Sequence, residues 1–319
     1  MLSRLSHKEI LQLAKRAVIP PLKPEFHKGQ CGRVCVIGGC EDYTGAPYFS
    51  AHSAALFGAD LTHLMCELNA APVIKSYTPN LMVHPYLREA GSGNAPMSKI
   101  HSLLDRMHVC VVGPGLGRDK NMLDSVVSIL EYLATEHKGE IPVVLDADGL
   151  FLISDESYSG KVCDILRAFK PGRIILTPNV VEFKRILDRF GFESGAEIAR
   201  ELQCVVLQKG SEDQIWYDDT VLKCSIQGSN KRVGGQGDTL TGVIATMLAF
   251  SRATHDFKIW DPNQKLEWLD MVVTSCYVGS AITRECSRLA FQKHGRSMQT
   301  TDVNDRVGDA YDLLLGGEN

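Results

Sequence analysis

The sequence predicts an α/β protein with a mostly parallel central sheet that helices cover on both faces. Short apolar segments, among them "RVCVIGG" at 33–39 and "HVCVVGPG" at 108–115, alternate with longer segments of helical periodicity. The apolar segments are continuous rather than alternating with polar residues, which is typical of strands buried on both faces of a parallel sheet. Polar and glycine-rich residues follow the ends of these segments, where ligands bind in such sheets. We therefore expect repeated βα units with a small-molecule site along one edge of the sheet.

Residues 1–27 are predicted to form an N-terminal helix and a lead-in to the sheet. Ser6 and Glu9 have the spacing of a capping box, and apolar residues follow at helical spacing until Pro20 and Pro21 stop the helix. The segment "MLSRLSHKEILQLAKR" is also basic and poor in acidic residues, as mitochondrial transit segments are. We favour a folded surface helix and a cytoplasmic protein, with a mitochondrial pool as the alternative.

The elements that follow alternate along the chain. Further strands are predicted at 61–67, 141–149, 173–179 and 204–210, and helices near 46–57, 97–106, 120–137 and 180–190. After residue 210 the pattern changes to two shorter strands, at 213–218 and 221–226, which a hairpin turn at Asp218 and Asp219 joins. Long helices then extend to the C-terminus. No linker-like or low-complexity segment interrupts residues 1–319, so we expect one domain.

Composition excludes several classes of partner. The formal net charge is -4 and the basic residues are scattered, so the chain offers no basic patch for nucleic acid or an anionic membrane surface. No apolar segment approaches the roughly 20 residues that span a bilayer. The 10 cysteines contain no CxxC pair, so we expect reduced core residues rather than disulfides or zinc ligands. We therefore expect the protein to bind or convert small molecules.

The segment "VGGQGDTLT" at 233–241 is a candidate anion site. Apolar residues recur at helical spacing from Leu240 onward, so the glycines form the entrance to a helix. Backbone N–H groups and the positive end of the helix dipole favour a phosphate at such an entrance. The spacing matches neither a Walker A loop nor a dinucleotide-binding fingerprint. Asp238 beside such an anion hole could accept a hydroxyl proton during phosphoryl transfer. The alternative is that Asp238 is only an N-cap and the glycines only a turn.

Four other segments place polar or glycine residues at strand ends. In "LTPNVVEFKRI", Asn179 and Glu182 have capping-box spacing, and Glu182 could also lie near a Mg²⁺ that accompanies a nucleotide. In "LDADGL", Asp146 and Asp148 would point to one side if the backbone stayed extended, and a strand end followed by a helix cap is the alternative. The glycines of "VVGPGLGRD" and Lys209 in "LQKGSEDQ" could approach a ligand or only form turns.

Taken in order, these segments resemble the ribokinase-like fold and, within it, the NAD(P)H-hydrate dehydratases of the eukaryotic, fungal, ATP-dependent type. The matching segments are "KGQCGRVCVIGG", "YTGAPYFSAHSAALFGADLTHL", "GPGLGRD", "LDADGL", "TPNVVEFKRI", "QKGSEDQI" and "GGQGDTLTGVIA", which span residues 28–246. The resemblance implies that ATP phosphorylates the C6 hydroxyl of the S form of hydrated NADH or NADPH. Elimination of the phosphate then restores NADH or NADPH, and ADP and phosphate are released.

The resemblance also implies roles for particular residues. Asp238 would be the catalytic base and would contact the hydrate. The residues implied to bind ATP are Lys209, Gly210, Ser211, Glu212, Asp213, Gly228, Ser229, Asn230, Lys231, Arg232, Val233, Gly234, Gly235, Gln236 and Gly237. Those implied to bind the hydrated nucleotide are Ala46, Gly115, Asn179, Val180, Val181, Glu182, Phe183, Lys184, Arg185 and Asp238. Mg²⁺ is implied as a cofactor of the nucleotide, without identified protein ligands.

Partners and alternatives follow from the same resemblance. Bacterial relatives often carry an epimerase domain in front and resemble ADP users, whereas this chain has no room for that domain, so a separate NAD(P)H-hydrate epimerase is the expected functional partner. Preference for ATP over ADP depends on the resemblance alone, and a homo-oligomer is compatible with the fold. The alternative enzyme is a ribokinase-like kinase of a sugar or vitamin precursor, which would use the same Asp238. A non-catalytic sensor of nicotinamide nucleotides is the alternative outside enzymes.

Overall fold

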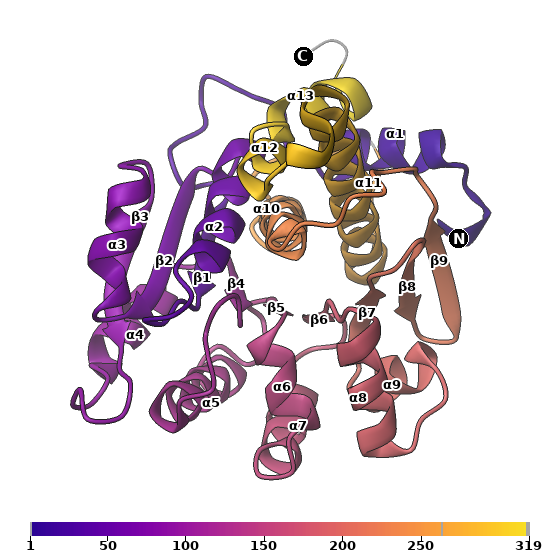
Figure 1. Cartoon of the computed structure of the whole chain (residues 1–319). Coiled ribbons are helices and arrows are strands. Elements are labelled where there is room, and N and C mark those ends of the chain that lie inside the picture. Colours follow the sequence, from indigo (N-terminus) through magenta and orange to yellow (C-terminus); the bar gives the residue numbers. More distant parts are fainter. Residues whose placement is uncertain (1, 263, 317–319) are drawn as a thin grey trace.

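The computed structural model describes residues 2–262 and 264–316, and its strands form one nine-stranded sheet (Figure 1). The strands are β1 (Arg33–Ile37), β2 (Leu61–Glu67), β3 (Met82–Leu87), β4 (Val109–Val112), β5 (Val143–Leu145), β6 (Ile174–Leu176), β7 (Val205–Gln208), β8 (Asp213–Tyr217) and β9 (Thr220–Cys224). Their order is β3-β2-β1-β4-β5-β6-β7-β8-β9, parallel as far as β7 and antiparallel from β7 to β9. The predicted mostly parallel sheet and the hairpin at its edge are confirmed.

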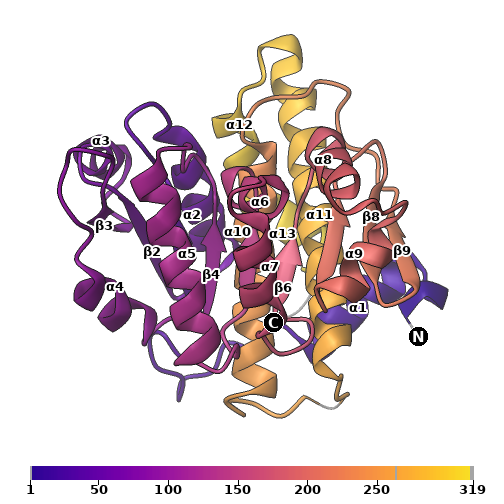
Figure 2. The same ribbon diagram turned by 90° about the horizontal axis from the view of Figure 1, so that it is seen from below.

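Helices cover both faces of this sheet. They are α1 (His7–Ala17), α2 (Gly45–Phe57), α3 (Ala70–Tyr77), α4 (Met97–Leu104), α5 (Lys120–Thr135), α6 (Asp148–Ser154), α7 (Ser159–Arg167), α8 (Val180–Phe190), α9 (Gly195–Glu201), α10 (Gln236–His255), α11 (Trp268–His294), α12 (Thr300–Asn304) and α13 (Val307–Leu314). Short 3-10 turns add Leu2–Arg4 and Gly295–Ser297. Helices α4 to α9 lie on one face, as the view from below shows (Figure 2), whereas α1, α2 and α10 to α13 lie on the other. Strand side chains feed the two cores alternately, so Val34 joins one and Cys35 the other.

The structure contains elements that the sequence pattern did not predict. Strand β3 at the sheet edge reads "MVHPYL", with Pro85 and a half-buried pattern that differ from the apolar central strands. Proline is tolerated there because an edge strand leaves some of its N–H groups outside the ladder. Helices α3, α6, α7 and α9 are only seven to nine residues long, too short for a strong periodic signal.

Helix α10 passes through the centre of the molecule. Every residue from Asp238 to Thr254 is buried, and a Cβ on Gly242 would lie 2.1 Å from the carbonyl oxygen of Ser50 on α2. Hydroxyl groups join the two helices at this close approach: Ser50 Oγ and Thr241 Oγ1 are 2.9 Å apart, and Thr246 Oγ1 donates to Ala54 O at 3.1 Å. The small residues therefore let α10 pack closely against α2, and hydroxyl groups at the contact find hydrogen-bond partners across it.

The N-terminal helix and the cysteines agree with the sequence predictions. In α1, Glu9 N donates to Ser6 Oγ at 3.4 Å and Ser6 N donates to Glu9 Oε2 at 2.7 Å, which is the predicted capping box. All ten cysteines lie in the described part of the chain, where they are buried and free of disulfides. Among the described residues, no helix has the length and apolar character needed to cross a bilayer.

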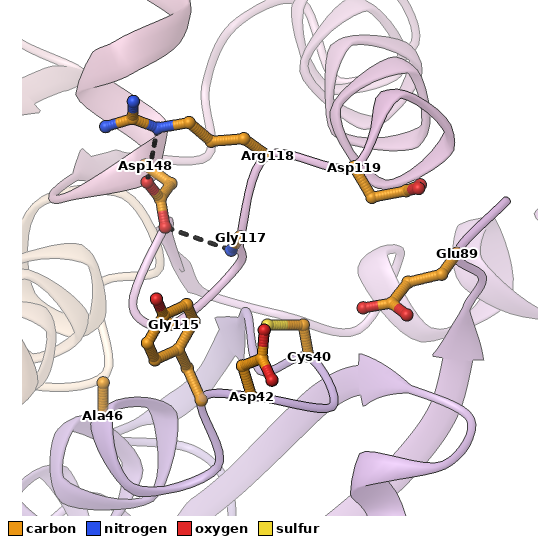
Figure 3. A pocket seen from close by; sticks show the side chains of 10 residues that line it. Cys40, Asp42, Ala46, Glu89, Gly115, Gly117, Arg118, Asp119 and Asp148 are labelled. Atoms are coloured by element: carbon orange, nitrogen blue, oxygen red, sulfur yellow. Dashed lines mark hydrogen bonds and ion pairs between the residues drawn. The ribbon is translucent and has the colours of Figure 1, made fainter.

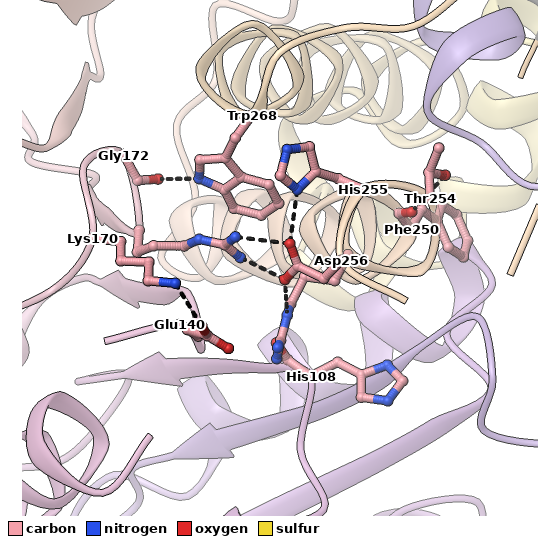
Figure 4. Close-up of polar contacts among 11 residues, drawn as sticks. His108, Glu140, Lys170, Gly172, Phe250, Thr254, His255, Asp256 and Trp268 are labelled. Atoms are coloured by element: carbon pink, nitrogen blue, oxygen red, sulfur yellow. Dashed lines mark hydrogen bonds and ion pairs between the residues drawn. The ribbon is translucent and has the colours of Figure 1, made fainter. Parts of the chain in front are cut away.

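A buried ion-pair cluster fixes the C-terminal end of α10 (Figure 4). Asp256 accepts hydrogen bonds from Arg173 at 2.8 and 2.9 Å, and one from Arg252 Nε at 2.7 Å. The guanidinium of Arg173 lies 3.4 Å from the ring centre of Trp268, whose Nε1 donates to Gly172 O at 3.1 Å. Burial raises the pKa of Asp256, but hydrogen bonds and the charge of Arg173 lower that pKa by more, so it lies well below its usual value. The cluster ties the end of α10 to the turn before β6 and to the start of α11.

We expect Asp256→Asn to lower the free energy of unfolding by about 3–5 kcal/mol, because Arg173 and Arg252 would keep buried charges without a counterion. Their side chains are each only 6% exposed. Equilibrium denaturation in urea measures the change. The control is Asp188→Asn, which removes a solvent-exposed partner of Lys184 and should cost about 0.5 kcal/mol or less. Equal effects of the two substitutions would contradict a stabilising role for the cluster.

Candidate active site

Asp238 lies in the first turn of α10, and it is not the N-cap of that helix. The N-cap is Gly235, whose φ of 100° lies in the left-handed region that glycine adopts readily. A Cβ on Gly235 would also lie 2.5 Å from Thr300 Cγ2, so the position has no room for a larger residue. The alternative of Asp238 as a simple cap is therefore wrong. Its side chain is free for another role, although the residue is only 8% exposed.

The carboxylate of Asp238 lies in a buried group of charges. Lys209 Nζ at the end of β7 donates to Asp146 Oδ1 at 2.7 Å, and Thr177 Oγ1 donates to the same oxygen at 2.9 Å. Burial and then the negative charge of Asp146 raise the pKa of Asp238 to about 8, while the positive charge of Lys209 opposes this shift. Burial also raises the pKa of Glu182, again opposed by Lys209. Lys209 thus interacts electrostatically with three carboxyl groups, those of Asp146, Glu182 and Asp238.

Of the two alternatives for Asp146 and Asp148, the extended one that points both side chains to one side is wrong. The two side chains do not point to one side, because Ala147 between them has φ 47° and ψ -117° and Asp148 already belongs to α6. Asp148 instead accepts from Gly117 N at 3.0 Å and from Arg118 Nε at 3.4 Å. A Cβ on Gly113 would lie 1.9 Å from Asp146 O, so this glycine of "VVGPGLGRD" serves close packing between strand ends.

A cavity of about 690 Å³ brings together many of the residues expected to bind ATP. Of that set, its lining includes Lys209, Gly210, Ser211, Asp213, Gly228, Arg232, Val233, Gln236 and Gly237. The expected ATP residues outside this lining are Glu212, Ser229, Asn230, Lys231, Gly234 and Gly235. Among these, Glu212 pairs with Lys223 at 3.1 Å, and Lys231 Nζ donates to Arg296 O. The first turn of α10, whose N–H groups have no partners within the helix, opens into this cavity.

The sequence did not predict that Leu240 of α10 and residues of α11 contribute to this cavity. Leu240, Thr283, Arg284 and Ser287 also line it. Arg284 Nη2 donates to Gly210 O at 3.0 Å and its Nε donates to Asp213 Oδ2 at 2.9 Å, which holds the loop after β7 in place. Thr283, Arg284 and Ser287 are three of many polar residues along α11, so neither periodicity nor a local motif singled them out in the sequence.

The residues expected to bind the hydrated nucleotide are distributed over three cavities. Asn179, Val180 and Val181 line the 690 Å³ cavity, and Ala46 and Gly115 line a second cavity of about 680 Å³ with several acidic residues (Figure 3). Glu182 and Arg185 line a third cavity of about 90 Å³. Phe183 is buried in the core, and Lys184 pairs with Asp188 on the surface.

The predicted capping box at the start of α8 is confirmed. Asn179 Oδ1 accepts from Val181 N and Glu182 N at 2.9 Å, and Asn179 N donates to Glu182 Oε2 at 2.8 Å. The box uses one oxygen of the Glu182 carboxylate, and no hydrogen bond within the described chain engages the other. A role for Glu182 near a metal stays a prediction.

The sheet order places Asp146 between the 680 Å³ and 690 Å³ cavities, and Asp238 interacts with Asp146 from the first turn of α10. One cavity is lined from the ends of β1 and β4, the other from the ends of β6 and β7, and β5 with Asp146 lies between these pairs of strands. Asp238 interacts electrostatically with both Asp146 and Lys209 at this position. A base here could act on a hydroxyl group from one cavity while the helix N-terminus stabilises a phosphoryl group from the other.

The fold is that of ribokinase-like proteins. A ribokinase-like superfamily protein from Enterococcus faecalis superimposes with a TM-score of 0.71 at 22% identity, covering 98% of this chain and 96% of that chain. The chain belongs to the NAD(P)H-hydrate dehydratase family, since the sequence profile of that family matches residues 34–308. The ATP-dependent (S)-NAD(P)H-hydrate dehydratase of Saccharomyces cerevisiae is 56% identical over 340 aligned positions, 99% of this chain and 100% of that protein. The resemblance inferred from the sequence is confirmed.

A second solved structure shares the fold. The ADP/ATP-dependent NAD(P)H-hydrate dehydratase from Bacillus subtilis, co-crystallised with ATP and Mg²⁺, superimposes with a TM-score of 0.64 at 20% identity, covering 97% of each chain.

We expect Asp238→Asn to stabilise the protein more at pH 8.5 than at pH 5. With a pKa of about 8 in the folded state and about 4 when unfolded, the carboxyl binds more protons in the folded protein, so its contribution to stability falls as pH rises between these values. Asparagine does not titrate, so the difference in unfolding free energy between variant and wild type should shift by on the order of 3 kcal/mol. Urea denaturation at both pH values measures it. A difference independent of pH would contradict the raised pKa.

Proposed function

We propose that this protein is a hydro-lyase that repairs damaged nicotinamide nucleotides. It uses ATP to dehydrate the S form of hydrated NADH and NADPH. The single observation that supports this most directly is the buried Asp238 in the first turn of α10, which directly follows Gly237 in the lining of the 690 Å³ cavity and interacts electrostatically with Lys209 and Asp146. The 56% identity to the S. cerevisiae dehydratase over nearly the whole chain supports the same activity.

ATP occupies the 690 Å³ cavity in this proposal. Its lining combines apolar side chains suited to a nucleobase, such as Val233 and Leu240, with cationic ones suited to phosphates, such as Lys209 and Arg232. The N–H groups of the first turn of α10 supply the anion hole for the transferred phosphoryl group.

The chemistry has two steps. Asp238 accepts the proton of the C6 hydroxyl while the hydroxyl oxygen bonds to the γ-phosphorus and the bond from phosphorus to ADP breaks. The ring nitrogen's electron pair then expels phosphate from C6, and loss of a proton from C5 restores the dihydronicotinamide. The net products are NADH or NADPH, ADP and phosphate. A carboxylate with a pKa of about 8 is a competent base near neutral pH.

Mg²⁺ fits this site as an ion carried with the nucleotide. Among the described residues, no group of three or more His, Cys, Asp or Glu side chains is arranged to hold a metal. Mg²⁺ in phosphoryl-transfer sites is usually held by one or two carboxylates, substrate phosphates and water, and Glu182 would hold it here. Its chemistry when bound is to neutralise charge on the phosphates.

The remaining roles are also proposals. A separate epimerase would convert the R form of the hydrate, because the proposed activity is limited to the S form. A cytoplasmic location is supported by the folding of the basic N-terminal segment into α1, where Ile10 and Ala14 join the core. Homo-oligomerisation stays a prediction from the fold.

We expect purified protein with Mg²⁺ and ATP to restore the dihydronicotinamide absorbance of hydrated NADH with equimolar release of phosphate. Parallel reactions with ADP in place of ATP test the nucleotide preference that the family implies. Absorbance and phosphate are followed in the same samples. Failure with both nucleotides would contradict the proposal and favour a kinase of a small alcohol, for which a stable phosphate ester is the diagnostic product.

We expect Asp238→Asn to lower kcat by roughly 100-fold or more while the Kd for ATP changes by about threefold or less, because the carboxylate acts on the hydroxyl proton. In the wild type, kcat/KM should rise with pH and level off above an apparent pKa near 8, because only the ionised carboxylate can accept the proton. Steady-state kinetics and calorimetric titration of ATP separate the two effects. Equal loss of turnover and of ATP affinity would show that Asp238 only supports nucleotide binding.

A further inference from the structure

A small cavity of about 90 Å³ lies beside the 680 Å³ cavity. The two share Arg118 and Asp148, and the small one extends to Phe151 and Ser154 of α6 and to Arg185 of α8. Its volume is far below the roughly 300 Å³ at which sites for whole small molecules begin. It therefore suits a single substituent of a ligand whose main part occupies the larger cavity.

Two arginines line this small cavity, and neither is fully used within the described chain. Asp148 engages only Nε of Arg118, at 3.4 Å, and both terminal nitrogens have no hydrogen-bond partner among residues 2–262 and 264–316 (Figure 3). No hydrogen bond or ion pair within the described residues involves Arg185. Two carboxylates, Asp148 and Glu182, also line the cavity: Asp148 accepts from Gly117 N and from Arg118 Nε, and one oxygen of Glu182 accepts from Asn179 N.

Arg118 is also held in position by an aromatic ring. Its guanidinium carbon lies 4.3 Å from the ring centre of Phe151, a cation–π contact that restricts a long side chain. A planar guanidinium fixed in this way presents its two terminal nitrogens as a pair, which matches the oxygens of a phosphate.

We propose that Arg118 and Arg185 bind the 2′-phosphate of hydrated NADPH and so set the preference between the two hydrates. This inference rests on the proposed function. The 2′-phosphate is the only group that distinguishes NADPH hydrate from NADH hydrate, and it is a terminal dianionic substituent. The pyrophosphate is a poorer fit to the small cavity, because it lies mid-chain and needs room for a nucleoside on each side.

The test compares kcat/KM for hydrated NADPH and hydrated NADH in Arg185→Gln and Arg118→Gln. We expect each substitution to lower the ratio of kcat/KM for NADPH hydrate to kcat/KM for NADH hydrate by roughly tenfold, because only NADPH hydrate loses a charged contact. Arg185→Lys should retain part of the preference. The matched control is Lys161→Gln, which removes an exposed positive charge paired with Glu131 on the same side of the sheet and should affect neither substrate.

Equal losses with both hydrates would overturn the proposal, since they would indicate contact with the pyrophosphate. Unchanged values with both would also overturn it. Fluorescence titration of the wild type and Arg185→Gln with NADPH and NADH tests the pocket without turnover. Selective weakening of NADPH binding would support the proposal even if the proteins dehydrated neither hydrate, a result that would contradict only the proposed function. If the wild type did not bind NADPH, the assignment of the small cavity to the 2′-phosphate would be contradicted.

Discussion

The ammonium group of Lys209 and the carboxylate of Asp146 are 2.7 Å apart where β7 and β5 end, and Asp238 lies in the electrostatic field of both. Burial alone would keep the Asp238 carboxyl protonated, and Asp146 adds to this effect. Lys209 is the charge that opposes them. The site therefore depends on a balance: enough burial to exclude water from a phosphoryl transfer, and enough positive charge for the base to ionise.

The position of that base depends on a helix fixed at both ends. Gly235 turns the chain into α10 at one end, and the cluster around Asp256 holds the other end, about 30 Å away for a helix of 20 residues. Between them, the hydroxyl contacts with α2 prevent the helix from sliding. A rigid helix places both its N–H groups and Asp238 without help from a mobile loop.

Most of the sheet could be predicted from the sequence because its central strands are continuously apolar. The Asn179–Glu182 capping box and the helix entrance at 233–241 could be predicted because both are local patterns. The turn at Ala147 could not, since a positive φ is uncommon outside glycine and the sequence gives no sign of it. The hydrogen bond from Arg284 to Gly210 O could not be predicted either, because the two residues are 74 positions apart in the sequence.

The burial of the ten cysteines has a consequence for the protein's own durability. Burial raises the pKa of Cys31 to about 11 and that of Cys66 to about 12, and the same effect raises the pKa of the other eight thiols. At neutral pH, a thiol of pKa 11 is ionised in roughly one molecule in 10,000, and the thiolate is the form that oxidants and electrophiles attack. The buried thiols are therefore poor nucleophiles at neutral pH, and Cys40, which lines the 680 Å³ cavity, is the one among them that a ligand of that cavity could approach.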